Sequence, residues 1–170
     1  RMVLDFRTSG AILNYVNGSE VARYSQVGVV TPDHAIRTKN FPLVTPPAGS
    51  ENFADGVRAA VNKYVADYHA YFARHDGVRE PAKTALDPMP RVVLVPGLGL
   101  FGAGANAGAA AIAADIAENT VRVITDAEAI GTYQPVDEAA MFDIEYWSLE
   151  QAKLSKSAEK PLARQIAVVT

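Results

Sequence analysis

Apolar residues recur with a helical period along most of the chain, and their spacing predicts four helices. Over 52–75 they return every three or four positions while charged residues fall mostly between them, which is typical of an amphipathic helix. The stretch 105–130 shows the same steps after an alanine-rich beginning. A shorter helix is predicted over 8–16, with Thr8 or Ser9 as its N-cap, and a last helical region over 137–153.

The stretch 105–130 has an alternative interpretation. A break near Asn119 would make 121–125 a strand that ends at Asp126, and that carboxylate would then occupy the ribose-binding position of a dinucleotide-binding βαβ unit. The continuous apolar stripe favours one long helix.

Short runs of β-branched and aliphatic residues predict strands over 3–6, 27–30, 91–95 and 165–170. The proline-rich segment 41–47 is expected to be extended, as an edge strand. Because strands and helices alternate, we expect an α/β fold, specifically a Rossmann-like three-layer sandwich with a mostly parallel sheet.

Composition and charge narrow the class of protein. Of 170 residues 49% are hydrophobic and 21% charged, so one domain with a real core is expected. The net charge of −3 offers no basic surface for nucleic acid, and no apolar run reaches the roughly 18 residues of a membrane span. Without cysteine there are no disulfides and no thiolate metal sites, and a cytoplasmic enzyme is compatible with this composition.

A glycine-rich segment follows the predicted strand 91–95. Its glycines are Gly97, Gly99, Gly102 and Gly104. The first three fit the spacing G-x-G-x-x-G, so the loop amides and the next helix N-terminus are candidates to bind the phosphates of a dinucleotide. Pro96 and Phe101 are unlike a typical dinucleotide turn, and the glycines could instead allow close packing against a neighbouring helix or domain.

Four ionisable residues follow the predicted strand 27–30. They are Asp33, His34, Arg37 and Lys39. They lie where open α/β sheets bind ligands, so Arg37 and Lys39 are candidates to bind a phosphate or carboxylate. A solvated charged turn would explain the same residues.

Familiar catalytic and metal-binding motifs are missing from the sequence. His69 and His75 are six residues apart on a predicted helix, a spacing that does not stack two zinc ligands, and there is no H-E-x-x-H. Neither G-x-S-x-G nor a P-loop occurs. We therefore assign no catalytic residue and no metal ligand.

Several segments together resemble the bifunctional class II aldolase/short-chain dehydrogenase family, whose members include rhamnulose-1-phosphate aldolase/alcohol dehydrogenases of rhamnose metabolism. They are TPDHAIRTK (31–39), DYHAYFARH (67–75), PRVVLVPGLGLFG (90–102), AADIAENTVRVITDAEAIG (113–131), FDIEYWSLEQAKL (142–154) and the final KPLARQIAVVT. This resemblance covers nearly the whole chain.

The resemblance implies that the chain is the region between the aldolase and dehydrogenase domains of an oxidoreductase. Residues 1–154 would form a central α/β domain, and residues 155–170 a linker and the first strand of a dehydrogenase domain that is missing here. Zinc and NAD(P) would belong to the parent protein rather than to this fragment, which is expected to be inactive alone.

The partners implied are the flanking aldolase and dehydrogenase domains, with a sugar phosphate as ligand and no nucleic acid or membrane. Surfaces left by the missing domains could also favour a homo-oligomer. The alternative function is a free-standing nucleotide or phosphosugar binding module that uses the glycines of 97–104.

Overall fold

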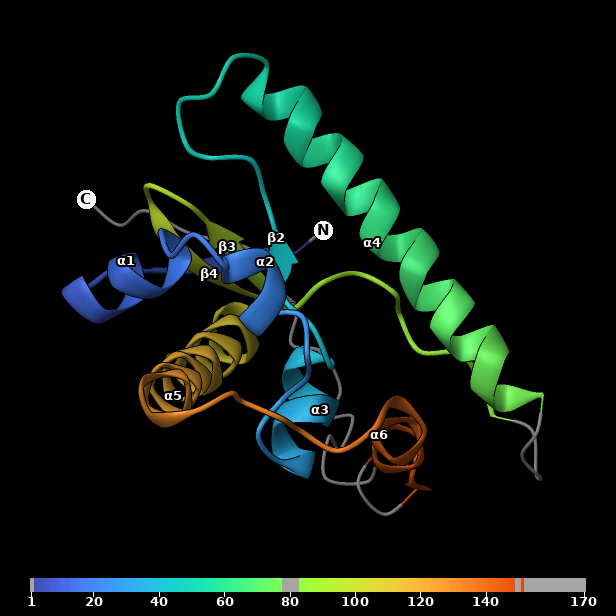
Figure 1. Cartoon of the computed structure of the whole chain (residues 1–170). Coiled ribbons are helices and arrows are strands. Elements are labelled where there is room, and N and C mark those ends of the chain that lie inside the picture. Colours follow the sequence, from blue (N-terminus) through green and yellow to red (C-terminus); the bar gives the residue numbers. More distant parts are fainter. Residues whose placement is uncertain (1, 78–82, 149–150, 152–170) are drawn as a thin grey trace.

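The computed structural model describes residues 2–77, 83–148 and 151, and within them four strands form one mixed sheet (Figure 1). The strands are β1 (Val3–Arg7), β2 (Leu43–Val44), β3 (Val92–Val95) and β4 (Gly99–Gly104), in the order β1-β4-β3-β2. Strand β4 pairs antiparallel with both β1 and β3, and only β2 pairs parallel, with β3. The expected Rossmann-like sandwich with a mostly parallel sheet is therefore wrong.

The physical reason for this difference is a hairpin where we expected a loop. Gly97 has φ 83° and Gly99 has φ 144°, conformations that favour glycine, and the Leu98 amide donates to the Val95 carbonyl at 3.0 Å. The chain reverses there, so Gly99–Gly104 runs back beside β3 as strand β4. A short turn allows only antiparallel pairing, whereas a parallel neighbour would need a long crossover.

The helices agree better with the sequence predictions. They are α1 (Gly10–Val16), α2 (Val21–Tyr24), α3 (Pro32–Thr38), α4 (Phe53–Asp76), α5 (Ala107–Ile130) and α6 (Glu138–Glu145). Helices α1, α4 and α5 confirm the predictions for 8–16, 52–75 and 105–130, and Ser9 caps α1 by accepting from the Ile12 amide at 3.2 Å. Because α5 is continuous, the alternative strand over 121–125 is wrong.

Two predicted segments took another form. Residues 27–30 are not a strand, and 31–39 is mainly helix α3, which begins with Thr31 as N-cap and Pro32 in the first turn. Threonine followed by proline is a strong helix start, and it outweighed the extended conformation that we expected. The segment 41–47 does contain an edge strand, β2, as predicted. The predicted strand 165–170 lies outside the described residues.

One face of the sheet is packed tightly by α1 and α5. The core here combines residues of both helices with β3 and β4: Ile12, Tyr15, Val16, Val92, Leu94, Leu100, Ala114, Ala117, Val121 and Ile124. Helix α5 approaches β4 so closely that a Cβ on Gly102 would lie 2.3 Å from the Ala110 carbonyl oxygen, and one on Gly104 would lie 2.4 Å from the Ala110 nitrogen. These two glycines therefore make the contact between helix and strand possible.

The opposite face of the sheet is covered less completely. Helix α4 runs diagonally past the body of the molecule, and its C-terminal half lies near α6 (Figure 1). There Tyr68 and Tyr71 of α4 pack with Phe142 and Tyr146 in a second cluster. Glu138, in the first turn of α6, pairs with the last turn of α4, since it accepts from Arg74 at 3.0 Å. Within the described part of the chain, none of the helices has the length and apolar character that crossing a membrane requires.

The close approach of α5 to β4 predicts that Gly102→Val lowers the free energy of unfolding by about 3 kcal/mol, because the new side chain would collide with backbone that has no room to move. Urea denaturation measures this loss. The matched control is Gly10→Ala, whose Cβ meets nothing within 4 Å and which should change stability by less than about 1 kcal/mol. Equal effects of the two substitutions would contradict the packing argument.

Candidate functional site

A large cleft lies between the second face of the sheet and helix α4. Its volume is about 1160 Å³. Val93, Val95 and Phe101 of the sheet form one apolar wall, and Val57 and Val61 of α4 form another. At one end the cleft is polar, because it meets the end of α3, the segment before β3 and the end of α6. An apolar cavity with a few convergent polar groups is the usual form of a small-molecule site.

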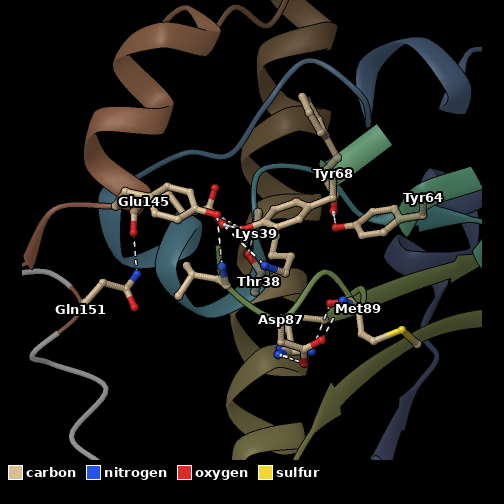
Figure 2. A network of polar contacts seen from close by, with 12 residues as sticks. Thr38, Lys39, Tyr64, Tyr68, Asp87, Met89, Glu145 and Gln151 are labelled. Atoms are coloured by element: carbon tan, nitrogen blue, oxygen red, sulfur yellow. Dashed lines mark hydrogen bonds and ion pairs between the residues drawn. The ribbon is translucent and has the colours of Figure 1, made fainter. Parts of the chain in front are cut away.

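Three buried polar residues from three different elements meet at this end of the cleft (Figure 2). Lys39 follows α3, Tyr68 lies on α4, and Glu145 is the last residue of α6. The Lys39 Nζ lies 3.6 Å from Glu145 Oε1 and 3.8 Å from the centre of the Tyr68 ring. Tyr68 donates its hydroxyl proton to the same Glu145 oxygen at 2.8 Å, so carboxylate and ring hold the ammonium together.

The backbone at Lys39 is strained. Its φ of 63° and ψ of 173° fall in a region that is essentially restricted to glycine, at a cost on the order of 1–3 kcal/mol for other residues. Its amide still donates to the Ala35 carbonyl at 3.0 Å and so ends α3. A lysine stands where glycine would be favoured, and its side chain is directed into the interior, where the residue is only 6% exposed.

Burial changes the acid–base properties of this group. Loss of hydration lowers the pKa of Lys39 to about 8, and the positive charge of Arg91 adds to that effect, whereas Glu145 and Asp87 oppose it. The pKa of Tyr68 is raised, first by burial and then by the charge of Glu145, so its hydroxyl stays protonated and can donate. The site therefore holds an amine that titrates near neutral pH.

Two arginines also line the cleft, and they differ in their partners. Arg91 donates to Asp87 Oδ2 at 2.7 Å. Burial works to raise the pKa of Asp87, but hydrogen bonds from Arg91 and from the Met89 amide outweigh it and leave that pKa lowered. Arg37, at the end of α3, forms no ion pair with any described residue. Since Lys39 faces Glu145 and Arg91 faces Asp87, Arg37 is the uncompensated positive charge of the cleft.

Some buried polar atoms near Lys39 have no hydrogen-bond partner among the described residues. They include Glu145 Oε2 and the Tyr71 hydroxyl. Tyr71 lies near enough for Glu145 to raise its pKa, after burial as the larger cause. Hydrogen bonding to Glu145 also contributes to the raised pKa of Tyr71, so the Tyr71 hydroxyl and the Glu145 carboxylate are candidate partners for each other.

The structure separates the four ionisable residues predicted as a group. Arg37 and Lys39 both line the cleft, whereas Asp33 and His34 do not. Asp33 is exposed in the first turn of α3, and the His34 ring is buried with its Nδ1 2.6 Å from the Thr31 hydroxyl oxygen. Burial lowers the pKa of His34. Arg37 and Lys39 share the cleft because both lie at the end of helix α3.

The glycines are placed differently from the expected phosphate-binding loop. Of the four, only Gly104 lines the cleft. Helix α5 occupies the space beside Gly102 and Gly104, and a Cβ on Gly99 would lie 2.4 Å from the Arg7 carbonyl oxygen. Gly97 donates its amide proton to Asn17 Oδ1 at 2.6 Å. These contacts favour the packing interpretation, while nucleotide binding at 97–104 stays a prediction.

Sequence reasoning missed Glu145, Tyr68 and Arg91. Glu145 carried a usable signal, because it stands four residues after Met141 and three after Phe142, on the buried face of α6. A carboxylate at a core position needs a partner, so a buried cation elsewhere in the chain was the implied counterpart. Its identity was not readable, since Lys39 lies more than 100 positions away in the sequence.

No three histidine, aspartate or glutamate side chains lie together as a metal site would require, in the part of the chain that the structure describes. The described residues therefore do not fit the zinc that the resemblance implies for the parent protein, and we derive no step through a metal.

A mixed four-stranded α/β domain with a cleft on one face of its sheet defines the class of this protein, and comparison with known proteins identifies its family. The chain belongs to the family described as the second domain of class II aldolases, which matches residues 1–154.

Two individual proteins are also similar. The uncharacterized oxidoreductase YuxG of Bacillus subtilis (strain 168) is 27% identical over 175 residues, which cover all of this chain and 25% of that protein. The chain thus spans about a quarter of the length of this relative. The crystal structure of YgbL from Klebsiella pneumoniae, a candidate aldolase/epimerase/decarboxylase, is 16% identical with a TM-score of 0.49 and covers 78% of this chain and 52% of its own.

The lowered pKa of Lys39 predicts how stability depends on pH. Between pH 8 and 10.5 the unfolded chain binds more protons at this lysine than the folded chain, so its contribution to stability rises with pH in that window. From pH 7 to 9 the free energy of unfolding of the unaltered protein should rise by about 1 kcal/mol more than that of the Lys39→Met variant, as measured by urea denaturation. The control variant Lys63→Met, at an exposed position, should show the same pH dependence of stability as the unaltered protein. If the stability of Lys39→Met also followed the pH dependence of the unaltered protein, the lowered pKa of Lys39 would be contradicted.

Proposed function

We propose that this domain binds a hydroxylated anion of the sugar-phosphate type within a longer polypeptide that combines class II aldolase and short-chain dehydrogenase activities. Arg37 is the observation that supports this most directly, because it lines a cleft of about 1160 Å³ without an ion-pair partner among the described residues. Guanidinium groups bind phosphate and carboxylate through paired hydrogen bonds. The apolar walls opposite would exclude water and strengthen that contact.

The hydroxyl groups of such a ligand have candidate partners at the same end of the cleft. The Glu145 carboxylate lines this end of the cleft, and a carboxylate can accept a hydrogen bond from a sugar hydroxyl. Lys39 lies beside the carboxylate and offers N–H donors to a second ligand oxygen. A site that binds one anionic group and several hydroxyl groups suits a sugar phosphate. An example is rhamnulose 1-phosphate, the compound of rhamnose metabolism that the resemblance suggests.

The proposal that the domain connects two others has separate support. The relative YuxG is named an oxidoreductase, and this chain corresponds to only a quarter of it. In addition, Leu4 and Phe6 on edge strand β1 are 57% and 45% exposed, and the Phe6 ring lies 4.9 Å from that of Phe101. Apolar side chains gathered at a sheet edge suit contact with a neighbouring domain. Zinc and NAD(P) would then be bound by the flanking domains.

The anion site can be tested by titrating the chain with inorganic phosphate and with rhamnulose 1-phosphate while the melting temperature is followed, because a ligand that binds only the folded state raises it. We expect the sugar phosphate to bind more tightly, and Arg37→Gln to weaken it about tenfold through loss of a charge-assisted hydrogen bond. Arg58→Gln, on an exposed position of α4 outside the cleft, is the matched control. The proposal fails if neither ligand shifts melting, or if both substitutions weaken binding equally.

A further inference from the structure

The ε-amine of Lys39 is held in an unusual way. It is almost entirely removed from water, with its Nζ above the ring of Tyr68, yet the residue lines the large cleft. The 3.6 Å to Glu145 Oε1 is longer than a hydrogen bond, and Nζ donates none to the described residues. The amine is thus shielded from water and held by one carboxylate and one aromatic ring rather than by a full set of hydrogen-bond acceptors.

The polar and charged groups around the amine lie on three different parts of the chain. Glu145 lies on α6, Asp87 and Arg91 lie in the segment that leads into β3, and Tyr68 lies on α4. Arg37 lines the same cleft. On the other side, a smaller cavity of about 180 Å³ brings in Asp67, Arg74 and Glu138. Arg91 disfavours a second positive charge, while the carboxylate of Glu145 is the nearest group able to accept a proton.

The strain of the backbone adds an independent observation. Lys39 adopts a conformation that glycine would adopt freely, and the surrounding structure nevertheless holds the lysine side chain against Glu145 and Tyr68. Strain of this kind gathers at functional sites, where the rest of the fold compensates for it. Capping α3 does not require a side chain there, since the backbone amide makes the hydrogen bond to Ala35.

We propose that Lys39 is a carbonyl-reactive amine, which forms an imine with a small aldehyde or ketone bound in the cleft. Burial in an apolar site activates a lysine as a nucleophile, and that condition is met here. Arg91 adds to the effect, which the charge of Glu145 opposes. Lys39 lines the cleft, whose volume of about 1160 Å³ is large enough for a small carbonyl compound. This activity is additional to anion binding, because it needs a carbonyl group and not a phosphate.

The chemistry requires only groups that the site contains. After Lys39 gives up its ammonium proton, with Glu145 as the nearest acceptor, the neutral nitrogen attacks the carbonyl carbon and a C–N bond forms as the C–O π bond breaks. One proton then passes from the attacking nitrogen to the alkoxide to give the neutral carbinolamine, and the proton held by Glu145 is returned to its hydroxyl group. The C–O σ bond breaks as water leaves, and the nitrogen lone pair closes the C=N bond of the protonated imine. One water is released and nothing is oxidised or reduced. Glu145 accepts and returns the proton in this sequence.

The test is reductive trapping with glycolaldehyde and cyanoborohydride, which supplies the hydride that turns an imine into a stable secondary amine. Peptide mass spectrometry then compares Lys39 with Lys63, an exposed lysine on α4 within the same sample. At pH 8 about half of the Lys39 amine is neutral, against less than about 1% for an ordinary lysine. We expect Lys39 to be labelled at least about ten times faster than Lys63. Equal rates would overturn the proposal.

Variants separate reactivity from structural roles. Lys39→Arg keeps the cation but forms no imine, so trapping at this position should disappear while labelling of Lys63 is unchanged. Glu145→Gln removes the anion that favours the ammonium, so the pH midpoint of Lys39 labelling should move downward; an unchanged midpoint would contradict the role of Glu145. If either variant fails to fold, the comparison of Lys39 with Lys63 in the unaltered chain still decides.

Failure of the anion site and failure of the reactive amine can be distinguished. Glycolaldehyde carries no charge, so its trapping at Lys39 needs no anion site, and the exposed control Arg58→Gln should leave both the trapping and the sugar-phosphate binding within about twofold. If Lys39 is trapped but no phosphate binds, the reactive-amine proposal holds and the anion-binding proposal fails. Phosphate binding without preferential trapping would reduce Lys39 to a binding residue.

Discussion

The contact of Lys39 with Glu145 and Tyr68 is the interaction on which the functional end of this domain depends. It joins the end of α3, the end of α6 and the middle of α4. Helices α4 and α6 also meet in the aromatic cluster of Tyr71, Phe142 and their neighbours, and α3 meets α6 through Ala35 and Met141. Each charge would be expensive to bury alone, so the two are retained together. The same contact keeps α6 in position at the polar end of the cleft.

A second constraint, the close packing of α5 on β4, explains why most of the cleft lies on the other face of the sheet. Gly102 and Gly104 let the helix backbone approach the strand, and alanines of α5 such as Ala114 fill the narrow space. Among the described elements the other face receives the diagonal helix α4, and Ala109 and Ile112 of α5 also line the cleft (Figure 1). A long helix that touches a twisted sheet at few points leaves room beneath it, and the apolar walls of the cleft result from that geometry.

The chain belongs to the class II aldolase second-domain family, and its cleft is lined by both Arg37 and Lys39. In the proposed function Arg37, which has no ion-pair partner among the described residues, would bind an anion, and the desolvated Lys39 would act as a nucleophile in the same cleft. Anion binding and carbonyl chemistry suit the same class of compound, because a sugar phosphate carries both groups. Exposed apolar residues on β1 suit contact with a neighbouring domain of a longer polypeptide.

The sequence by itself determined the long helices α4 and α5, the capped helix α1, and the strand that became β3, because each depends on periodicity and caps within one segment. It also pointed to Arg37 and Lys39. The direction of β4 and the grouping of Lys39 with Glu145 were decided only by tertiary structure. A run of glycines is compatible with a loop or a strand until a helix packs on it, and two buried charges more than 100 residues apart become partners only when the fold removes water from both.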